Sequence, residues 1–113
     1  VDAVYAPQDN GVASAMKTLV NVANQEKVPV FPSADTMVKD GGLASYAISQ
    51  YDLGKVAGEM AAQVLRGRKT ANFPVAYITK GKYIINAKEE KLLGIQLPAK
   101  MVKAAETKGE VFK

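Results

Sequence analysis

The stretch that decides the fold is residues 1–32, VDAVYAPQDNGVASAMKTLVNVANQEKVPVFP. Its first six residues form a short apolar run, which predicts a buried strand. A polar loop, PQDN, follows at residues 7–10. From Gly11 to Asn24 apolar residues recur with helical spacing, and Val28 to Pro32 is again an apolar run. Strand, helix and strand in this order predict two parallel strands joined by a right-handed crossover.

Polar residues follow both strands of this unit. Asp9 and Asn10 come after the first strand, and Asp35 and Thr36 lie in the polar loop, residues 33–42, after the second. In open α/β sheets, ligands bind at the carboxyl ends of the strands, so two neighbouring loops would face one cleft. Asp9 and Asn10 are also good helix N-caps, and a cap alone explains one of them. A plain surface loop is the alternative for Asp35.

The middle of the chain predicts a strand and a long helix. Residues 43–48 read as a strand, and Ser49 with Asp52 fits a capping box that opens a helix. The helix runs to about Arg66, and Gly67 is a natural residue to end it. The basic run from Arg66 to Lys69 then complements the negative end of the helix dipole.

The last third predicts short elements. Residues 75–78 and 83–85 read as strands, and Asn86 with Glu89 fits a second capping box. The short helix that it opens ends at Gly94, and Pro98 starts a final helix. The polar tail, residues 106–113, is expected to fray.

Composition narrows the possible functions. The chain has 113 residues, of which 48% are hydrophobic and 23% charged, as in an ordinary globular domain. It contains no cysteine and no histidine, which excludes disulfides, thiol chemistry and histidine-based triads. No nucleotide-binding, zinc-protease or hydrolase motif occurs. We therefore expect a binding protein without a cofactor or a metal, rather than an enzyme.

The net charge of +4 does not indicate nucleic-acid binding, because the lysines are scattered and no aromatic residues are interleaved with a basic run. No apolar run approaches the roughly 18 residues of a membrane span, and no signal peptide is visible. Because the chain starts directly on a strand, we expect it to be a fragment of a larger architecture.

Several runs of sequence carry a family resemblance. They are VYAPQDNGVASAM, VPVFPSADTMVKDGGLASYAISQYDLGKVAGEMAAQVLRG and INAKEEKLLGI, in this order within residues 1–102. They resemble the second half of ABC-transporter substrate-binding proteins of the type I periplasmic-binding fold. Within that group the chain is similar to extracytoplasmic lipoproteins that bind amino acids, tryptophan or tyrosine in some members.

The resemblance implies an α/β fold, a parallel-sheet, flavodoxin-like lobe of a two-lobe protein. Residues 1–42 would be a β-α-β unit of the second lobe, residues 43–74 a crossing strand and helix, and residues 75–113 the return strands and C-terminal helices. The implied partners are the missing N-terminal half and a membrane permease. The location is extracytoplasmic, at the cell surface as a lipoprotein or in the periplasm. An isolated chain is expected to dimerise or exchange strands, or to collapse into one compact unit.

The resemblance also implies an amino acid as the small-molecule ligand, bound where hinge closure brings two lobes together. An aspartate would accept hydrogen bonds from its ammonium group, and an asparagine with helix backbone N–H groups would donate to its carboxylate. Gly11 stands where the family often has a hydroxyl residue, which leaves the ligand's identity open. Two tyrosines would supply an aromatic wall. The candidate ligand-binding residues are Asp9, Asn10, Gly11, Asp35, Thr36, Tyr46 and Tyr51.

Three functions remain open at this point. The first is the extracytoplasmic solute-binding component of an ABC importer, with an aromatic amino acid favoured as its ligand. The second is the effector-binding domain of a transcriptional regulator with the same α/β wiring. The third is a stand-alone α/β interaction module with no small ligand. The residues alone, without the resemblance, support only an α/β binding domain.

Overall fold

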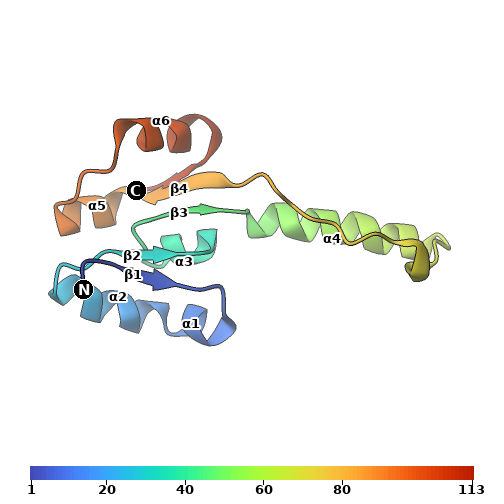
Figure 1. Ribbon diagram of the computed structural model, residues 1–113, viewed down its shortest axis with the longest axis horizontal. Coiled ribbons are helices and arrows are strands. Elements are labelled where there is room, and N and C mark those ends of the chain that lie inside the picture. Colours follow the sequence, from blue (N-terminus) through green and yellow to red (C-terminus); the bar gives the residue numbers. More distant parts are fainter.

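The predicted β-α-β unit forms at the start of the chain. The computed structural model describes residues 1–113, and in it β1 (Val4–Ala6) and β2 (Val30–Pro32) pair in parallel (Figure 1). The helix expected over residues 11–24 is divided into α1 (Asn10–Ser14) and α2 (Met16–Gln25). The division follows Ser14, whose Oγ donates to the Asn10 carbonyl oxygen at 2.8 Å, a local bond that competes with a continuous helix.

The apolar stripe of α2 forms one core. Met16, Val20 and Ala23 are buried against Ala6 and Val30 on one face of the two parallel strands. The alternation along β1 and β2 turns the next residues, Tyr5 and Phe31, to the opposite face. The predicted helical stripe is confirmed at Met16 and Ala23, whereas Val22, which it also included, is 59% exposed.

The segment after β2 is not the loop that we expected. Asp35–Lys39 is a short helix, α3, because Met37 and Val38 turn inward and are buried. Leu43 then donates its backbone N–H to the Val30 carbonyl oxygen at 2.7 Å, which brings β3 (Ala44–Ala47) alongside β2.

The C-terminal third supplies two strands of a second sheet, which has three strands in the order β3-β4-β5 beside the two-stranded sheet of β1 and β2. β4 (Lys82–Asn86) runs antiparallel to β3 and parallel to β5 (Glu110–Phe112). The chain between β4 and β5 forms α5 (Ala87–Leu93) and α6 (Ala99–Lys108), which cover a second core that includes Leu43, Ile85 and Ala105. The prediction that the tail frays is wrong, since α6 continues to Lys108 and β5 pairs with β4 beyond it.

A long arm leaves this body. We call residues 50–81 the arm and the remaining residues the body. The arm consists of α4 (Gln50–Leu65), a single 3₁₀ turn η1 (Thr70–Asn72) and an extended return (Figure 1). The predicted strand at residues 75–78 is wrong, because this return pairs with no other strand. The radius of gyration is 16.8 Å, against about 13 Å for a compact chain of this length, so the chain does not collapse into one compact unit.

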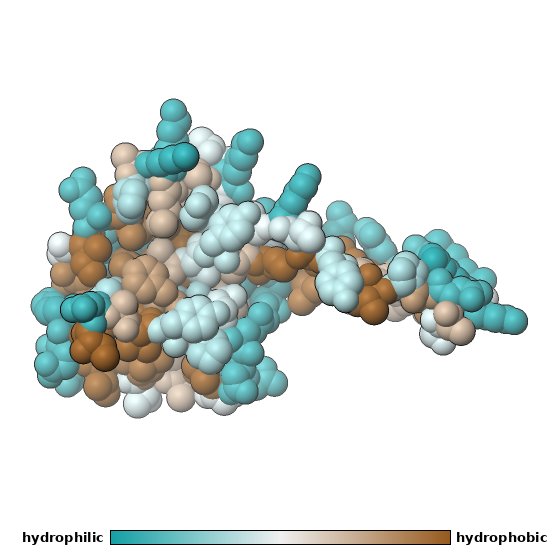
Figure 2. Space-filling model, viewed as in Figure 1, coloured by the Kyte–Doolittle hydropathy of each residue, from teal (hydrophilic) through white to brown (hydrophobic).

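The arm is apolar where it stands free. No residue of α4 is buried, and the side chains of Leu65, Val75 and Tyr77 are at least 72% exposed. Figure 2 shows hydrophobic residues exposed along the arm and hydrophilic ones gathered at its tip. No helix in the chain combines the length and the apolar character that crossing a bilayer requires.

Candidate ligand-binding site

The carboxyl ends of β1, β2 and β3 all point toward the side from which the arm leaves the body (Figure 1). A cavity of about 300 Å³ lies there, and we call it the hollow. Residues from both the body and the arm line it, so it sits where the two parts meet. Its lining residues are Gln8, Ser33, Tyr46, Ala47, Ile48, Gln50, Leu53, Thr79 and Gly81.

Tyr46 is the aromatic wall of the hollow. Its ring lies 5.0 Å from the ring of Tyr83, its cross-strand neighbour on β4, at an angle of 59°. The ring also rests on the backbone of Gly81, where a β-carbon would stand 2.8 Å from the Tyr46 Cε1 atom. Tyr46 remains 63% exposed, so one side of the ring is open to a ligand.

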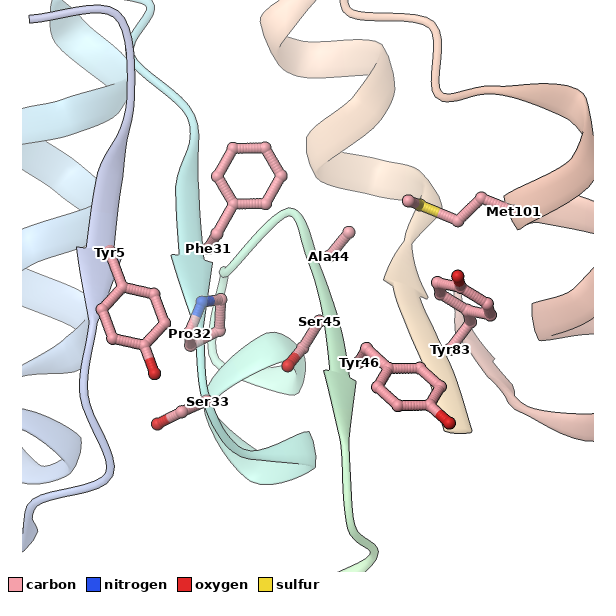
Figure 3. Close-up of a pocket in the computed structure, with 9 residues that line it drawn as sticks. All are labelled: Tyr5, Phe31, Pro32, Ser33, Ala44, Ser45, Tyr46, Tyr83 and Met101. Carbon is pink, nitrogen blue, oxygen red and sulfur yellow. The ribbon is translucent and has the colours of Figure 1, made fainter. Parts of the chain in front are cut away.

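A second cavity, the aromatic groove, adjoins the hollow. It measures about 240 Å³ and lies on the sheet face that carries Tyr5, Phe31 and Tyr83 (Figure 3). Ser33 and Tyr46 line both cavities and separate them. Because ligands of open α/β sheets bind at the strand ends and not on the sheet face, the hollow is the candidate site.

The first predicted loop flanks the hollow. Asp9 caps α1, since its Oδ1 accepts from the Val12 backbone N–H at 3.0 Å. Asn10 and Gly11 form the exposed first turn of that helix, and the hollow is lined instead by the preceding residue, Gln8. The cap therefore accounts for Asp9 Oδ1 and leaves its second oxygen free of a protein partner.

The second predicted loop is connected to the hollow through Gln50, which lines it. Asp35 accepts the Thr36 backbone N–H on Oδ1 at 2.9 Å and the Gln50 backbone N–H on Oδ2 at 3.3 Å. The second bond ties the body to the first residue of α4. Each carboxylate oxygen has further lone-pair capacity, so Asp35 still has room for a ligand donor. The Thr36 side chain is exposed.

The start of α4 is organised differently from the predicted capping box. Ser49 Oγ accepts from the Asp52 backbone N–H at 3.4 Å, but the Asp52 carboxylate does not reach back. It pairs with Lys82 Nζ at 3.2 Å, across the two chain segments that join the arm to the body. Tyr51, the second predicted aromatic residue, is 79% exposed and does not line the hollow.

Four polar lining residues were missed by sequence reasoning: Gln8, Ser33, Gln50 and Thr79. For two of them a signal existed. Gln8 and Ser33 are the first polar residues after β1 and β2, whereas our prediction favoured the charged and amide residues one or two positions later. Thr79 carries no such signal, because its place depends on how the arm returns.

The chemistry available in the hollow is hydrogen bonding and aromatic contact. The lining residues offer amide, hydroxyl and backbone polar groups, all uncharged, beside the phenol ring of Tyr46. Nowhere in the chain do three or more potential metal-ligating side chains of histidine, cysteine, aspartate or glutamate gather. Such a lining suits a small ligand with both a polar and an apolar part.

A family model and a known protein are similar to this chain. Residues 1–108 match the family model described as ABC transporter substrate binding protein. The tyrosine-binding protein of Clostridioides difficile strain R20291 is 36% identical over 96 residues, which are 85% of this chain and 28% of that protein.

Solved structures are also similar to this chain. The ABC domain from Streptococcus pneumoniae in complex with L-Trp is 45% identical over 99% of this chain, with a TM-score of 0.89. A conserved domain protein from Vibrio cholerae O1 biovar El Tor is 30% identical over 99% of the chain, with a TM-score of 0.87. A ligand-free, open substrate-binding protein with adhesive properties from Clostridium difficile is 35% identical over 88%, with a TM-score of 0.62.

The chain spans only part of each of these proteins. It covers 28% of the tyrosine-binding protein and 37%, 36% and 34% of the three solved chains, in the order given. The similarity thus includes almost all of this chain and about a third of each relative.

Proposed function

Since this chain belongs to the family of ABC transporter substrate-binding proteins, we propose that it is part of an extracytoplasmic solute-binding protein that serves an ABC importer. Its role is to bind a small solute and present it to a membrane permease. The proposed location is the periplasm or the cell surface, with a lipid anchor in the second case. The family membership supports this role more than that of a regulator's effector domain or a stand-alone interaction module. It also supports binding without catalysis or nucleic-acid contact.

The proposed ligand is an aromatic amino acid. The observation that carries this proposal is the lining of the hollow, where the open side of the Tyr46 ring faces a cavity rimmed by uncharged polar side chains. An aromatic ring suits the apolar wall, and a zwitterionic head suits the polar rim. The L-Trp held by the relative from Streptococcus pneumoniae and the tyrosine-binding relative support the same class. Asp9, Asn10, Gly11, Asp35 and Thr36 are proposed as outer contacts of the head group, and Tyr51 as a further aromatic contact outside the hollow.

The arm is proposed to belong to a first lobe that the rest of the longer protein supplies. Three features support this. α4 buries none of its residues within this chain, the extended return has no strand partner, and the longer relatives have about twice as much further chain. The body would then be the second lobe, with the hinge at residues 48–49 and 80–81. Closure of the two lobes would enclose a ligand in the hollow.

An isolated chain of these 113 residues is expected to dimerise or exchange arms. The reason is that Leu65 and Tyr77, 88% and 82% exposed, would leave apolar surface in water. Light scattering coupled to gel filtration would give the mass. We expect a double variant, Leu65→Glu with Tyr77→Glu, to shift the chain toward the monomer. A parent chain that stays monomeric at every concentration tested would contradict this expectation.

Calorimetry on the full-length protein, stripped of ligand by unfolding and refolding, tests the function. The titrants are L-tryptophan, L-tyrosine and L-phenylalanine, with L-alanine and L-glutamate for comparison. Burial of an aromatic ring contributes about 1.5–3 kcal/mol, so we expect at least about tenfold tighter binding of an aromatic amino acid than of L-alanine. Refolded protein that binds none of the five would refute the proposal.

Replacement of Gly81 with alanine tests the placement of Tyr46. The new β-carbon would stand 2.8 Å from Tyr46 Cε1, so the ring must move. We expect the affinity for the aromatic ligand to fall about fivefold to tenfold, while the exposed ring moves at a stability cost below about 1 kcal/mol. The matched control is Gly94→Ala in the body, where a β-carbon meets nothing within 4 Å and the residue does not line the hollow, so the left-handed φ of 68° costs stability but not affinity. Equal affinities for Gly81→Ala and Gly94→Ala would show that the ring position is unimportant.

A further inference from the structure

The Ser33 hydroxyl is the one buried side-chain polar atom in the chain that has no hydrogen-bond partner. Its Oγ is shielded from solvent, although the residue as a whole is only partly buried. Folded proteins rarely leave such a group unpaired, because it has given up its water without a replacement. The unpaired Ser33 hydroxyl therefore needs a physical explanation, and its position in the structure provides one.

Ser33 is held in place by its surroundings. Its backbone N–H donates to the Ala6 carbonyl oxygen at 3.0 Å, which continues the pairing of β1 with β2 by one residue. The residues before and after it, Pro32 and Ala34, are both buried. The backbone is thus fixed, and the remaining freedom of the hydroxyl is rotation among the staggered side-chain rotamers and of the O–H bond.

Ser33 also stands at the junction of two environments. It lines the hollow on one side and the aromatic groove on the other, together with Tyr46 on the neighbouring strand (Figure 3). Gln8, Gln50 and Thr79 line the hollow with Ser33 and make it polar, whereas Tyr46 supplies its aromatic surface. A ligand whose ring lies on Tyr46 would bring its polar head to this junction.

We propose that the Ser33 hydroxyl is a hydrogen-bonding contact for the α-ammonium or α-carboxylate group of the amino acid, and so recognises the head group and not the ring. This inference rests on the function proposed above and names a residue for it. A serine hydroxyl both donates and accepts, so it serves either charged group. Bonds to charged groups are the stronger ones, which gives a buried, preformed hydroxyl a large share of the head-group affinity.

The choice between head group and ring has a measurable consequence. L-phenylalanine has the same head group as L-tryptophan and L-tyrosine but no polar atom on its ring. If Ser33 binds the head group, its loss weakens all three ligands by the same factor. If it binds a ring N–H or O–H, phenylalanine is unaffected.

The test is calorimetry of the full-length protein and its Ser33→Ala variant with these three amino acids. We expect the affinity of each ligand to fall by about tenfold to a hundredfold, in parallel. Ser33→Thr, which keeps the hydroxyl, should retain more affinity than Ser33→Ala. The control is Ser45→Ala, because Ser45 lines only the aromatic groove. It should leave all three affinities unchanged.

Thermal unfolding without ligand provides an independent readout. Because alanine removes an unsatisfied polar atom and fills nearly the same volume, the melting temperature of ligand-free Ser33→Ala should stay the same or rise. A loss of affinity limited to tryptophan and tyrosine, or no loss at all, would overturn the inference while the proposed function stands. Absence of binding by the unmodified protein would overturn both.

Discussion

Replacing Asn86 with alanine is expected to lower the free energy of unfolding by about 3 kcal/mol, because three hydrogen bonds of a buried side chain disappear together. Asn86 is 6% exposed at the end of β4. Its Nδ2 donates to the Val38 carbonyl oxygen at 2.9 Å, and its Oδ1 accepts from the backbone N–H groups of Lys88 and Glu89 at 3.1 and 3.3 Å. The hydrogen bonds of this one side chain thus link α3, β4 and α5.

Urea denaturation of the full-length protein would measure this loss as a lower midpoint with an unchanged slope. Asn86→Ser keeps a capping oxygen for α5 but does not reach Val38, so its loss should be smaller than that of Asn86→Ala. Asn21→Ala, at an exposed position of α2 in the body, should not lower the stability, because alanine is the better helix former. If Asn86→Ala were as stable as Asn21→Ala, the three hydrogen bonds of Asn86 would not stabilise the fold as we expect.

Replacing Tyr46 with alanine is expected to weaken binding of the aromatic ligand by about tenfold to a hundredfold. The ring is the only aromatic surface that lines the hollow. Removing it takes away the burial of the ligand ring and an aromatic pair contribution of about 0.5–1.5 kcal/mol. Because Tyr46 is 63% exposed in the ligand-free chain, its loss should affect binding far more than folding.

The informative comparison for Tyr46 is with its neighbour Tyr83. The two rings contact each other, but Tyr83 lines the aromatic groove and not the hollow. Titration of both alanine variants with L-tryptophan separates the two cavities. We expect a large loss of affinity for Tyr46→Ala and at most a few-fold loss for Tyr83→Ala. The reverse order would place the ligand in the groove on the sheet face.

Local patterns in the sequence predicted the elements whose contacts are local. The apolar spacing of α2 placed Met16 and Ala23 in the core, although it left out the buried Val20 and included Val22, which is 59% exposed. Gly94 ends α5 in the left-handed conformation with φ of 68°, as predicted. The β-α-β unit followed from the order of its elements alone, since a short crossover leaves only one favourable arrangement.

The wrong predictions concern residues whose structure depends on contacts with residues far away in the sequence. The Glu89 carboxylate was expected to complete a capping box but instead accepts from Asn24 Nδ2 at 2.9 Å, 65 residues away in the sequence. Residues 110–112 pair with β4, a contact that their position at the end of a mostly polar tail does not reveal. Residues 75–78 have the composition of a strand, but this chain contains no strand to pair with them.

The hollow and the residues named from the sequence overlap at one position. The rule that ligands bind at strand ends pointed to the end of the strands where the hollow lies, and of the seven residues named, Tyr46 lines it. The prediction favoured Asp9 and Asp35 because they are charged, whereas in the structure both carboxylates accept hydrogen bonds from backbone N–H groups. Thr79 and Gly81 were not predictable, since the path of the arm brings them to the hollow.

The most direct test of the central claim is a crystal structure of the full-length protein grown with L-tryptophan or L-tyrosine. We expect one ligand in the hollow, with its ring against Tyr46, its head group within hydrogen-bond distance of Ser33, and a first lobe packed on the arm. A ligand seated elsewhere, for example in the aromatic groove, or a hollow filled by other parts of the chain, would contradict the claim.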